Sequence, residues 1–94
     1  MDEFSHITQL LHASRPEEAI SVAGDVLKRN SLTQADKAEA YYLMGNAYRQ
    51  LNDFKEAMNC YCEAMELDPH SPAAMAYEAA QEVMGFYDHD LYNP

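Results

Sequence analysis

The sequence predicts an all-α fold of five helices in which neighbours in the chain run antiparallel. Apolar residues recur every three or four positions along most of the 94 residues, and no stretch shows the strict alternation of a strand. Only three glycines and four prolines are present, so turn-rich β structure is not expected. The connections between the expected helices are short, which favours antiparallel neighbours.

The first two helices are expected at 2–13 and 15–29. Ser14 with Glu17 three residues later has the pattern of a capping box, and Pro16 suits a first helical turn. The apolar stripes of these two helices contain Phe4, Ile7, Leu11, Ala19, Ile20, Ala23, Val26 and Leu27. Spacing of this kind puts one face of each helix toward a core.

The third and fourth helices are expected at 34–51 and 54–67. Thr33 and Asp53 precede them, and each can accept a hydrogen bond from the first turn. The stripe of the third helix is expected to contain Tyr41, Met44, Gly45 and Tyr48, and that of the fourth Phe54, Ala57, Met58, Tyr61, Ala64 and Met65. These faces should pack against each other.

The fifth helix is expected at 72–86. Ser71 serves as its cap, and Pro72 takes the first helical position. Its apolar residues are Met75, Ala76, Ala79, Ala80, Val83, Phe86 and Tyr87.

Gly45 lies in the interior of the third helix, where glycine costs about 1 kcal/mol relative to alanine. A tight helix contact would offset this cost. We expect Gly45 to lie against the alanine face of the fourth helix, formed by Ala57 and Ala64, with tyrosine rings filling the space on either side.

Residues 38–71 resemble the tetratricopeptide repeat. The residues that carry the resemblance are Tyr41, Met44, Gly45, Tyr48, Ala57, Tyr61, Ala64 and Pro69, with Phe54, Leu67 and Asp68 also typical. The resemblance implies helix–turn–helix units stacked in a right-handed superhelix, as in short, stand-alone bacterial members of the family. It also implies binding of protein partners rather than catalysis.

One domain, 1–94, is expected, with a single well-formed repeat at its centre. Residues 2–29 resemble a degenerate repeat whose turn is one residue shorter, with Thr8 where the repeat has Gly45. Residues 72–87 are expected to form a capping helix and 88–94 a tail. Flanking helices are needed because a single repeat cannot bury both of its apolar faces.

The chain is acidic, with sixteen Asp and Glu against six Lys and Arg and a formal charge of −10. Binding to nucleic acid or to an anionic membrane needs a basic patch, so neither is expected as a partner. The N-terminus lacks the basic flank of a signal peptide, and no apolar stretch is long enough to span a membrane. We therefore expect a cytoplasmic protein.

Cys60 and Cys62 are two positions apart in a helix and therefore point about 200° apart. That geometry opposes both a mutual disulfide and a shared metal. We expect two reduced thiols, with Cys60 inward and Cys62 outward.

No motif of an enzyme active site is present, and no nucleophile has a visible base. The sequence therefore predicts no enzyme and no cofactor. The alternative of another class is weak binding of a metal or small ligand at the acidic sequence Asp88-His89-Asp90, although such residues are usually just solvated.

A second stripe of the third helix, formed by Glu39, Tyr42, Asn46 and Arg49, lies about 130° around from the buried one. The resemblance implies that this face lines a concave groove that binds peptides. Asn46 can hydrogen-bond a peptide backbone and Arg49 can hold a carboxylate. The charge of the chain favours a basic or neutral apolar ligand, and the alternative is that these are ordinary exposed residues.

The C-terminal residues Phe86, Tyr87, Leu91 and Tyr92 are more aromatic than a solvated end requires. They either extend the capping helix over apolar surface or form a docking or dimer contact. The sequence thus predicts a non-catalytic module, a monomer or weak dimer, that binds a protein or peptide in its groove. The alternative is an accessory subunit of a complex that docks through the fifth helix and tail.

Overall fold

The computed structural model describes the backbone of residues 2–92 and the side chains of residues 3–83. Over this part of the chain the structure is all-α, which confirms the predicted fold class. Its helices are α1 (Asp2–His12), α2 (Pro16–Leu27), α3 (Gln34–Gln50), α4 (Phe54–Leu67) and α5 (Ala73–Tyr92). The first four agree with the predicted ranges within two residues at each end, whereas α5 continues to Tyr92, beyond the predicted end at 86.

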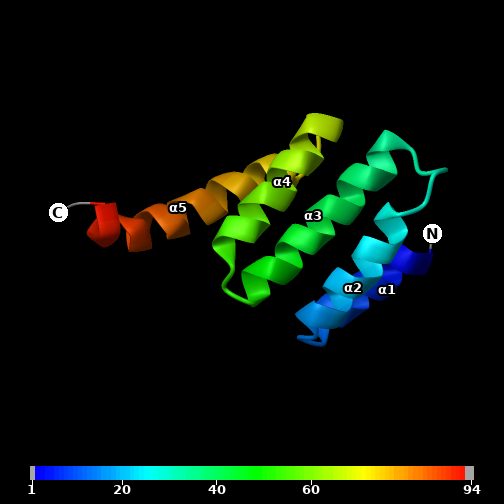
Figure 1. Cartoon of the computed structure of the whole chain (residues 1–94), viewed down its shortest axis with the longest axis horizontal. Coiled ribbons are helices and arrows are strands. Elements are labelled where there is room, and N and C mark those ends of the chain that lie inside the picture. The colour runs from blue at the N-terminus through cyan, green and yellow to red at the C-terminus, as the bar shows by residue number, and fades with distance from the viewer. Residues whose placement is uncertain (1, 93–94) are drawn as a thin grey trace.

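The helices stack side by side in chain order, with α3 in the middle (Figure 1). On one side α3 packs against α2 and, to a lesser extent, α1; on the other it packs against α4, which in turn packs against α5. The C-terminal end of α5 projects beyond the other helices (Figure 1). Because α3 is enclosed from two sides, it is the central element of the fold.

Two apolar clusters form the core, one on each side of α3. The buried residues of the first are Ile7, Leu10, Leu11, Ala19, Ala23, Leu43 and Ala47. The buried residues of the second are Ala38, Ala57, Tyr61, Ala64, Ala73 and Ala80. Each cluster draws residues from at least three helices, so burial of their apolar surface joins the helices into one unit.

The burial of α3 differs from the single predicted stripe. Leu43 and Ala47 are buried toward α1 and α2, whereas Tyr41 and Tyr48 are half-buried against the second cluster. A helix in contact with neighbours on two sides carries apolar residues around much of its circumference, so one stripe cannot describe it.

The turns of the two helical hairpins share one geometry, and this corrects the predicted capping box at Ser14. Ser14 has a φ of 59° and ends α1, and its side chain does not cap α2, whose N-cap residue is Arg15. The backbone N–H of Ser14 donates to Leu11 O (3.1 Å) and that of Arg15 to Leu10 O (2.8 Å). This pair of hydrogen bonds is a Schellman motif.

The connection after α3 repeats the motif at Asn52, whose φ is 61°. The N–H of Asn52 donates to Arg49 O and that of Asp53 to Tyr48 O, both at 2.9 Å. Asn52 and Ser14 are 38 positions apart, as are the N-cap residues Asp53 and Arg15. The two turns therefore have the same length, and the prediction of a turn one residue shorter in the first hairpin is wrong.

The other predicted helix starts are confirmed. Thr33 Oγ1 accepts a hydrogen bond from the Asp36 backbone N–H at 3.0 Å, and Asp53 Oδ1 accepts one from Glu56 at 3.2 Å. Ser71 Oγ accepts from the N–H of Ala73 at 3.1 Å. Each satisfies a donor that the first turn of a helix leaves without an intrahelical partner.

The predicted close contact at Gly45 is present, but its partner is an aromatic ring rather than the alanine face. A Cβ atom at Gly45 would lie 2.5 Å from Cε1 and 2.7 Å from Cδ1 of Tyr61. Tyr61 is fully buried, so its ring lies directly on the backbone of α3. Gly45 is therefore required by the position of Tyr61.

In the first hairpin the large and small residues are exchanged. The offset of 38 relates Gly45 to Ile7 and Tyr61 to Ala23, so Ile7 rather than Thr8 stands where the repeat has Gly45. Ile7 and Ala23 are both fully buried in the first cluster. The interpretation of 2–29 as a degenerate repeat stays a prediction, and this exchange is consistent with it.

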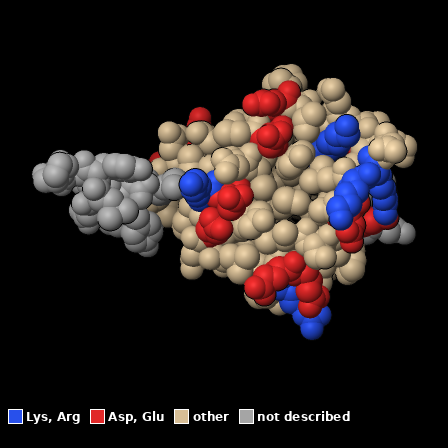
Figure 2. Space-filling view, viewed as in Figure 1, with Lys and Arg blue, Asp and Glu red and all other residues tan. Residues whose placement is uncertain are grey.

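Charged side chains form no continuous patch on the face drawn in Figure 2. Basic and acidic groups lie beside each other in several small mixed areas, with uncharged surface between these areas. Arg29, which follows α2, forms an ion pair with Glu3 of α1, and its hydrogen bond is the main reason why the pKa of Glu3 is lowered. At the described residues, no helix combines the length and the apolar character that crossing a bilayer requires.

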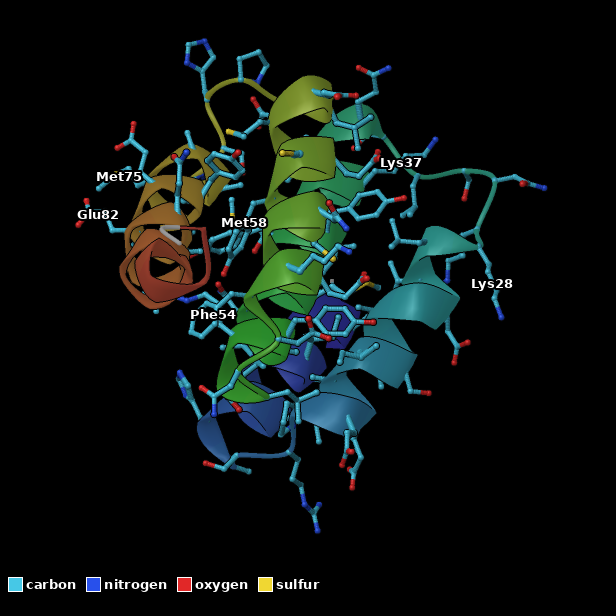
Figure 3. All side chains as sticks on the ribbon, turned by 60° about the vertical axis from the view of Figure 1, so that its left-hand side comes forward. Lys28, Lys37, Phe54, Met58, Met75 and Glu82 are labelled. Atoms are coloured by element: carbon cyan, nitrogen blue, oxygen red, sulfur yellow. The ribbon has the colours of Figure 1, made fainter. Side chains whose placement is uncertain are left out.

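The two faces of α5 differ in their surroundings. Phe54 and Met58 of α4 point toward α5, whereas Met75 and Glu82 of α5 point away from α4 (Figure 3). Met75 is 77% exposed.

Candidate functional site

An open groove of about 800 Å³ runs along α3. The residues that line it are Thr8, Leu11 and His12 of α1, Glu39, Tyr42, Leu43, Asn46, Arg49 and Gln50 of α3, Phe54 of α4 and Val83 of α5. All four residues of the predicted α3 stripe, Glu39, Tyr42, Asn46 and Arg49, are among them. The structure thus brings together side chains from four helices on one concave surface.

Asn46 is held from below by the buried Tyr61. The Tyr61 hydroxyl donates a hydrogen bond to Asn46 Oδ1 at 2.5 Å, so the Nδ2 amide group of this groove residue remains available as a donor. Burial raises the pKa of Tyr61 to about 12, although the nearby Arg49 guanidinium acts in the opposite direction. The phenol is therefore a neutral donor at physiological pH.

Tyr42 lies next to the same tyrosine. The ring centroids of Tyr42 and Tyr61 are 6.1 Å apart, and the ring planes are tilted by 41°. Tilted aromatic pairs at this separation are favourable beyond the area that they bury. Because Tyr42 also packs against both core clusters, its ring forms a firm part of the groove floor.

Glu39 is a half-buried carboxylate in the groove. Partial removal from water raises its pKa above the usual 4.5, because desolvation penalises the charged form. None of the ion pairs between described residues includes Glu39. Its negative charge therefore lies where the protein itself does little to offset the loss of hydration.

Replacing Glu39 with glutamine is expected to raise the melting temperature at pH 7. The folded-state pKa of Glu39 is higher than its unfolded value, so the folded state binds more protons and stability falls as pH rises through this range. The advantage of Glu39→Gln should shrink as pH is lowered toward the folded-state pKa and vanish below the unfolded value. Thermal melts monitored by circular dichroism between pH 3.5 and 8 measure it, at about half-unit steps. An advantage that does not change with pH would contradict this reasoning.

The opposite end of the groove carries basic and amide groups. Arg49 lies there, in the last turn of α3, and no ion pair between described residues includes it. The neighbouring Gln50 donates from Nε2 to Leu11 O at 2.9 Å, which ties the end of α3 to α1. His12 follows Leu11 at the last position of α1.

Sequence reasoning did not identify the groove residues contributed by the other helices. These are Thr8, Leu11, His12, Phe54 and Val83. Leu43 and Gln50 of α3 were not identified either. The offset of 38 places Thr8 and His12 at the positions equivalent to Asn46 and Gln50. Aligning the two hairpins at their turns, with this offset of 38, could therefore have identified the α1 residues that line the groove.

A second, shallower hollow of about 390 Å³ lies on α1. It is lined by Phe4, Ser5, Thr8, Gln9 and His12. Thr8 and His12 also line the main groove, so the two concave surfaces meet along α1.

The remaining predicted sites have different outcomes. Among the described residues, no group of three or more His, Cys, Asp or Glu side chains is placed to hold a metal ion. The side chains of Asp88, His89 and Asp90 lie outside the described residues. So do the predicted contact residues of the C-terminus, which are Phe86, Tyr87, Leu91 and Tyr92.

The two cysteines are free thiols with different exposure. Cys60 is buried and Cys62 is half-buried, in the order that the helix geometry predicted. Burial, with smaller contributions from neighbouring carboxylates, raises the pKa of Cys60 to about 12. Its thiol is therefore protonated and a poor nucleophile at neutral pH.

Comparison with known proteins agrees with this architecture. The profile of the tetratricopeptide repeat matches residues 38–71. The solution NMR structure of Bacteroides fragilis protein BF1650 is similar to this chain, with 40% sequence identity and a TM-score of 0.86 over 99% of this chain and 91% of that one. No curated protein matches the sequence.

The repeat indicates a protein-interaction module, because helical repeats of this family are generally non-enzymatic binding domains. The matched residues cover α3 from its second turn and the whole of α4, and the similarity to the Bacteroides fragilis protein covers nearly the whole chain. Residues 38–71 of this chain are a tetratricopeptide repeat.

Proposed function

We propose that the chain is a non-catalytic module that binds a segment of a partner protein in the groove along α3. The observation that carries the proposal is the convergence of Glu39, Tyr42, Asn46 and Arg49 on one open concave surface. The carboxylate of Glu39, the amide of Asn46 and the guanidinium of Arg49 can each form hydrogen bonds with a peptide. Tyr42 adds an aromatic face.

The groove offers the mixture of surfaces that peptide binding uses. Leu11 and Leu43 of its lining are buried, and together with Phe54 and Val83 they supply apolar area. Asn46 supplies an amide donor held in place by its hydrogen bond to Tyr61. Concave sites with apolar walls and a few oriented polar groups are the usual form of binding pockets.

Arg49 and Tyr42 are the expected anchors of the partner. Arginine and tyrosine are enriched among the residues that dominate binding energy, because each combines a large contact area with directional hydrogen bonds. Both are half-buried in the free chain, so part of their conformational freedom is already lost before binding.

The double substitution Tyr42→Ala with Arg49→Ala is expected to weaken partner binding by about thirtyfold or more, the combined effect of two anchors. The partner is first identified among proteins that co-purify with the wild-type chain, then produced and titrated by calorimetry. Circular dichroism checks that the variant is folded. Equal affinity of wild type and variant would refute the groove as the binding site.

The double substitution Met75→Ala with Glu82→Ala is the matched control. Both residues point away from α4 on the outer side of α5 (Figure 3), and neither lines the groove. The groove proposal requires that this control binds as the wild type does.

A second candidate is an accessory subunit that docks through α5 and the C-terminal residues. Met75, which is 77% exposed on the outer side of α5, offers apolar contact area for such docking. Loss of binding in the Met75→Ala, Glu82→Ala variant, with binding kept in the Tyr42→Ala, Arg49→Ala variant, would select this candidate.

A further inference from the structure

We propose that the groove selects an extended peptide segment in which a lysine or arginine and an acidic group are separated by four or five residues, with the basic group at Glu39 and the acidic group at Arg49. The inference rests on the proposed function and adds the chemistry of the ligand. It follows from the placement of charges, the orientation of Asn46 and the length of the groove.

The two ends of the groove have opposite charge. Glu39 and Arg49 both line it, and they are ten residues apart on α3 (49 − 39 = 10). At a rise of 1.5 Å per residue, their backbones are separated by ~15 Å along the helix axis. A ligand that meets both side chains must therefore carry the opposite charges in the opposite order, at a spacing of the order of this backbone separation.

Glu39 provides the reason for a basic residue in the ligand. Its carboxylate is half-buried, and no ion pair among the described residues includes it. A ligand cation would give it an opposite charge at a place already partly shielded from water, where Coulomb attraction is stronger than at an open surface. The chain's formal charge of −10 also attracts a basic group from a distance.

Arg49 provides the reason for an acidic group. Its planar guanidinium can bind a carboxylate through two parallel hydrogen bonds. It lines the groove close to the Tyr61 hydroxyl, and the ion pairs of the described residues leave it out. A ligand of basic residues alone would leave this end unmatched.

Asn46 indicates an extended ligand rather than a helical one. It lies between Glu39 and Arg49, and its Oδ1 already accepts the Tyr61 hydroxyl. The remaining Nδ2 group can donate to a ligand acceptor, which an extended backbone presents and a helix uses in its own hydrogen bonds. At about 3.3 Å per extended residue, ~15 Å corresponds to four or five residues.

Selection from a phage-displayed library of random twelve-residue peptides tests the inference with the full-length chain. Peptides enriched by the wild type are expected to contain a Lys or Arg separated from an Asp, Glu or free C-terminal carboxylate by four or five positions. With Glu39→Lys, the preference for the basic residue should become a preference for an acidic one. Glu66→Lys is the control, since Glu66 is exposed on α4, does not line the groove and changes the net charge equally.

Affinities of one enriched peptide make the test quantitative. Replacing its basic residue with alanine should weaken binding to the wild type about fivefold, the size expected for one partly exposed ion pair. The same replacement should leave binding to Glu39→Gln unchanged. Equal losses with both proteins would overturn the assignment of the basic residue to Glu39.

The outcomes separate the two proposals. Enriched peptides that lack the charge pattern, yet lose binding to the Tyr42→Ala, Arg49→Ala variant, overturn this inference and leave the groove as the binding site. Peptides that bind that variant as well as they bind the wild type overturn the groove itself. A library without any enriched peptide overturns both.

Discussion

Replacing Tyr61 with alanine is expected to lower the free energy of unfolding by about 4 kcal/mol, within the range measured for aromatic-to-alanine changes in protein cores. Tyr61 is the largest fully buried side chain between residues 3 and 83, and its ring lies against Gly45 on α3. Truncation would leave a cavity between α3 and α4 and remove the hydrogen bond to Asn46. Urea denaturation followed by circular dichroism measures the loss.

Tyr61→Phe is the matched control, because it keeps the ring and removes only the hydroxyl. The expected loss is about 1 kcal/mol, the usual net value of one hydrogen bond. A 94-residue domain has a total stability of roughly 5–14 kcal/mol, so the alanine substitution should remove about 30–80% of it, whereas the phenylalanine substitution should leave most of it in place. Similar losses in the two variants would contradict a packing role for the ring.

Replacing Gly45 with alanine is expected to lower the free energy of unfolding by about 1 kcal/mol. The added Cβ would lie 2.5 Å from Tyr61 Cε1, a distance that real contacts do not reach, so the buried ring or one of the two helices must shift. Overpacking of this kind costs about 1–3 kcal/mol, and the gain of helix propensity from glycine to alanine offsets only about 1 kcal/mol.

Gly24→Ala is the control with the opposite sign. No atom lies within 4 Å of a Cβ built at Gly24 in α2, so the substitution should raise stability by about 0.5–1 kcal/mol. The two variants differ only in what the new methyl group meets. If Gly45→Ala also stabilised the protein, the close contact with Tyr61 would be refuted.

The sequence predicted the helices well because their starts carry local signals. Thr33 and Asp53 cap the first turns of α3 and α4 with their own side chains, and both caps are present in the structure. Ser14 carries a similar signal, yet it adopts a positive φ and ends the preceding helix instead. Serine can stand either at the end of one helix or at the N-cap of the next, so its residue type alone could not distinguish these two positions.

The packing partners were harder to predict than the helices. A glycine within a helix indicates a close neighbour, but which residue that neighbour is depends on how the two helices cross. The alanines of α4 were plausible partners for Gly45, and the structure places the ring of Tyr61 there. Likewise, the burial of Leu43 depends on α1 and α2, which a stripe on α3 does not record.

The groove was predictable only where its residues share one helix. Spacing along α3, with the family resemblance, identified Glu39, Tyr42, Asn46 and Arg49, and all four line the groove. The residues of α1, α4 and α5 reach it through tertiary packing, which the spacing within one helix cannot specify. Tyr61 connects the core with the groove, because it packs in the second apolar cluster and its hydroxyl also bonds to Asn46.

The central claim is that the α3 groove, and no other surface, receives the partner. The most direct measurement is a titration of the ¹⁵N-labelled chain with an enriched peptide, followed through the chemical shifts of the backbone amides. We expect the largest changes at Tyr42, Asn46 and Arg49 and along the facing α1 wall, with little change at Met75 and Glu82. Shifts confined to α5 or to the outer faces of α2 and α4, with the groove residues unaffected, would contradict the claim.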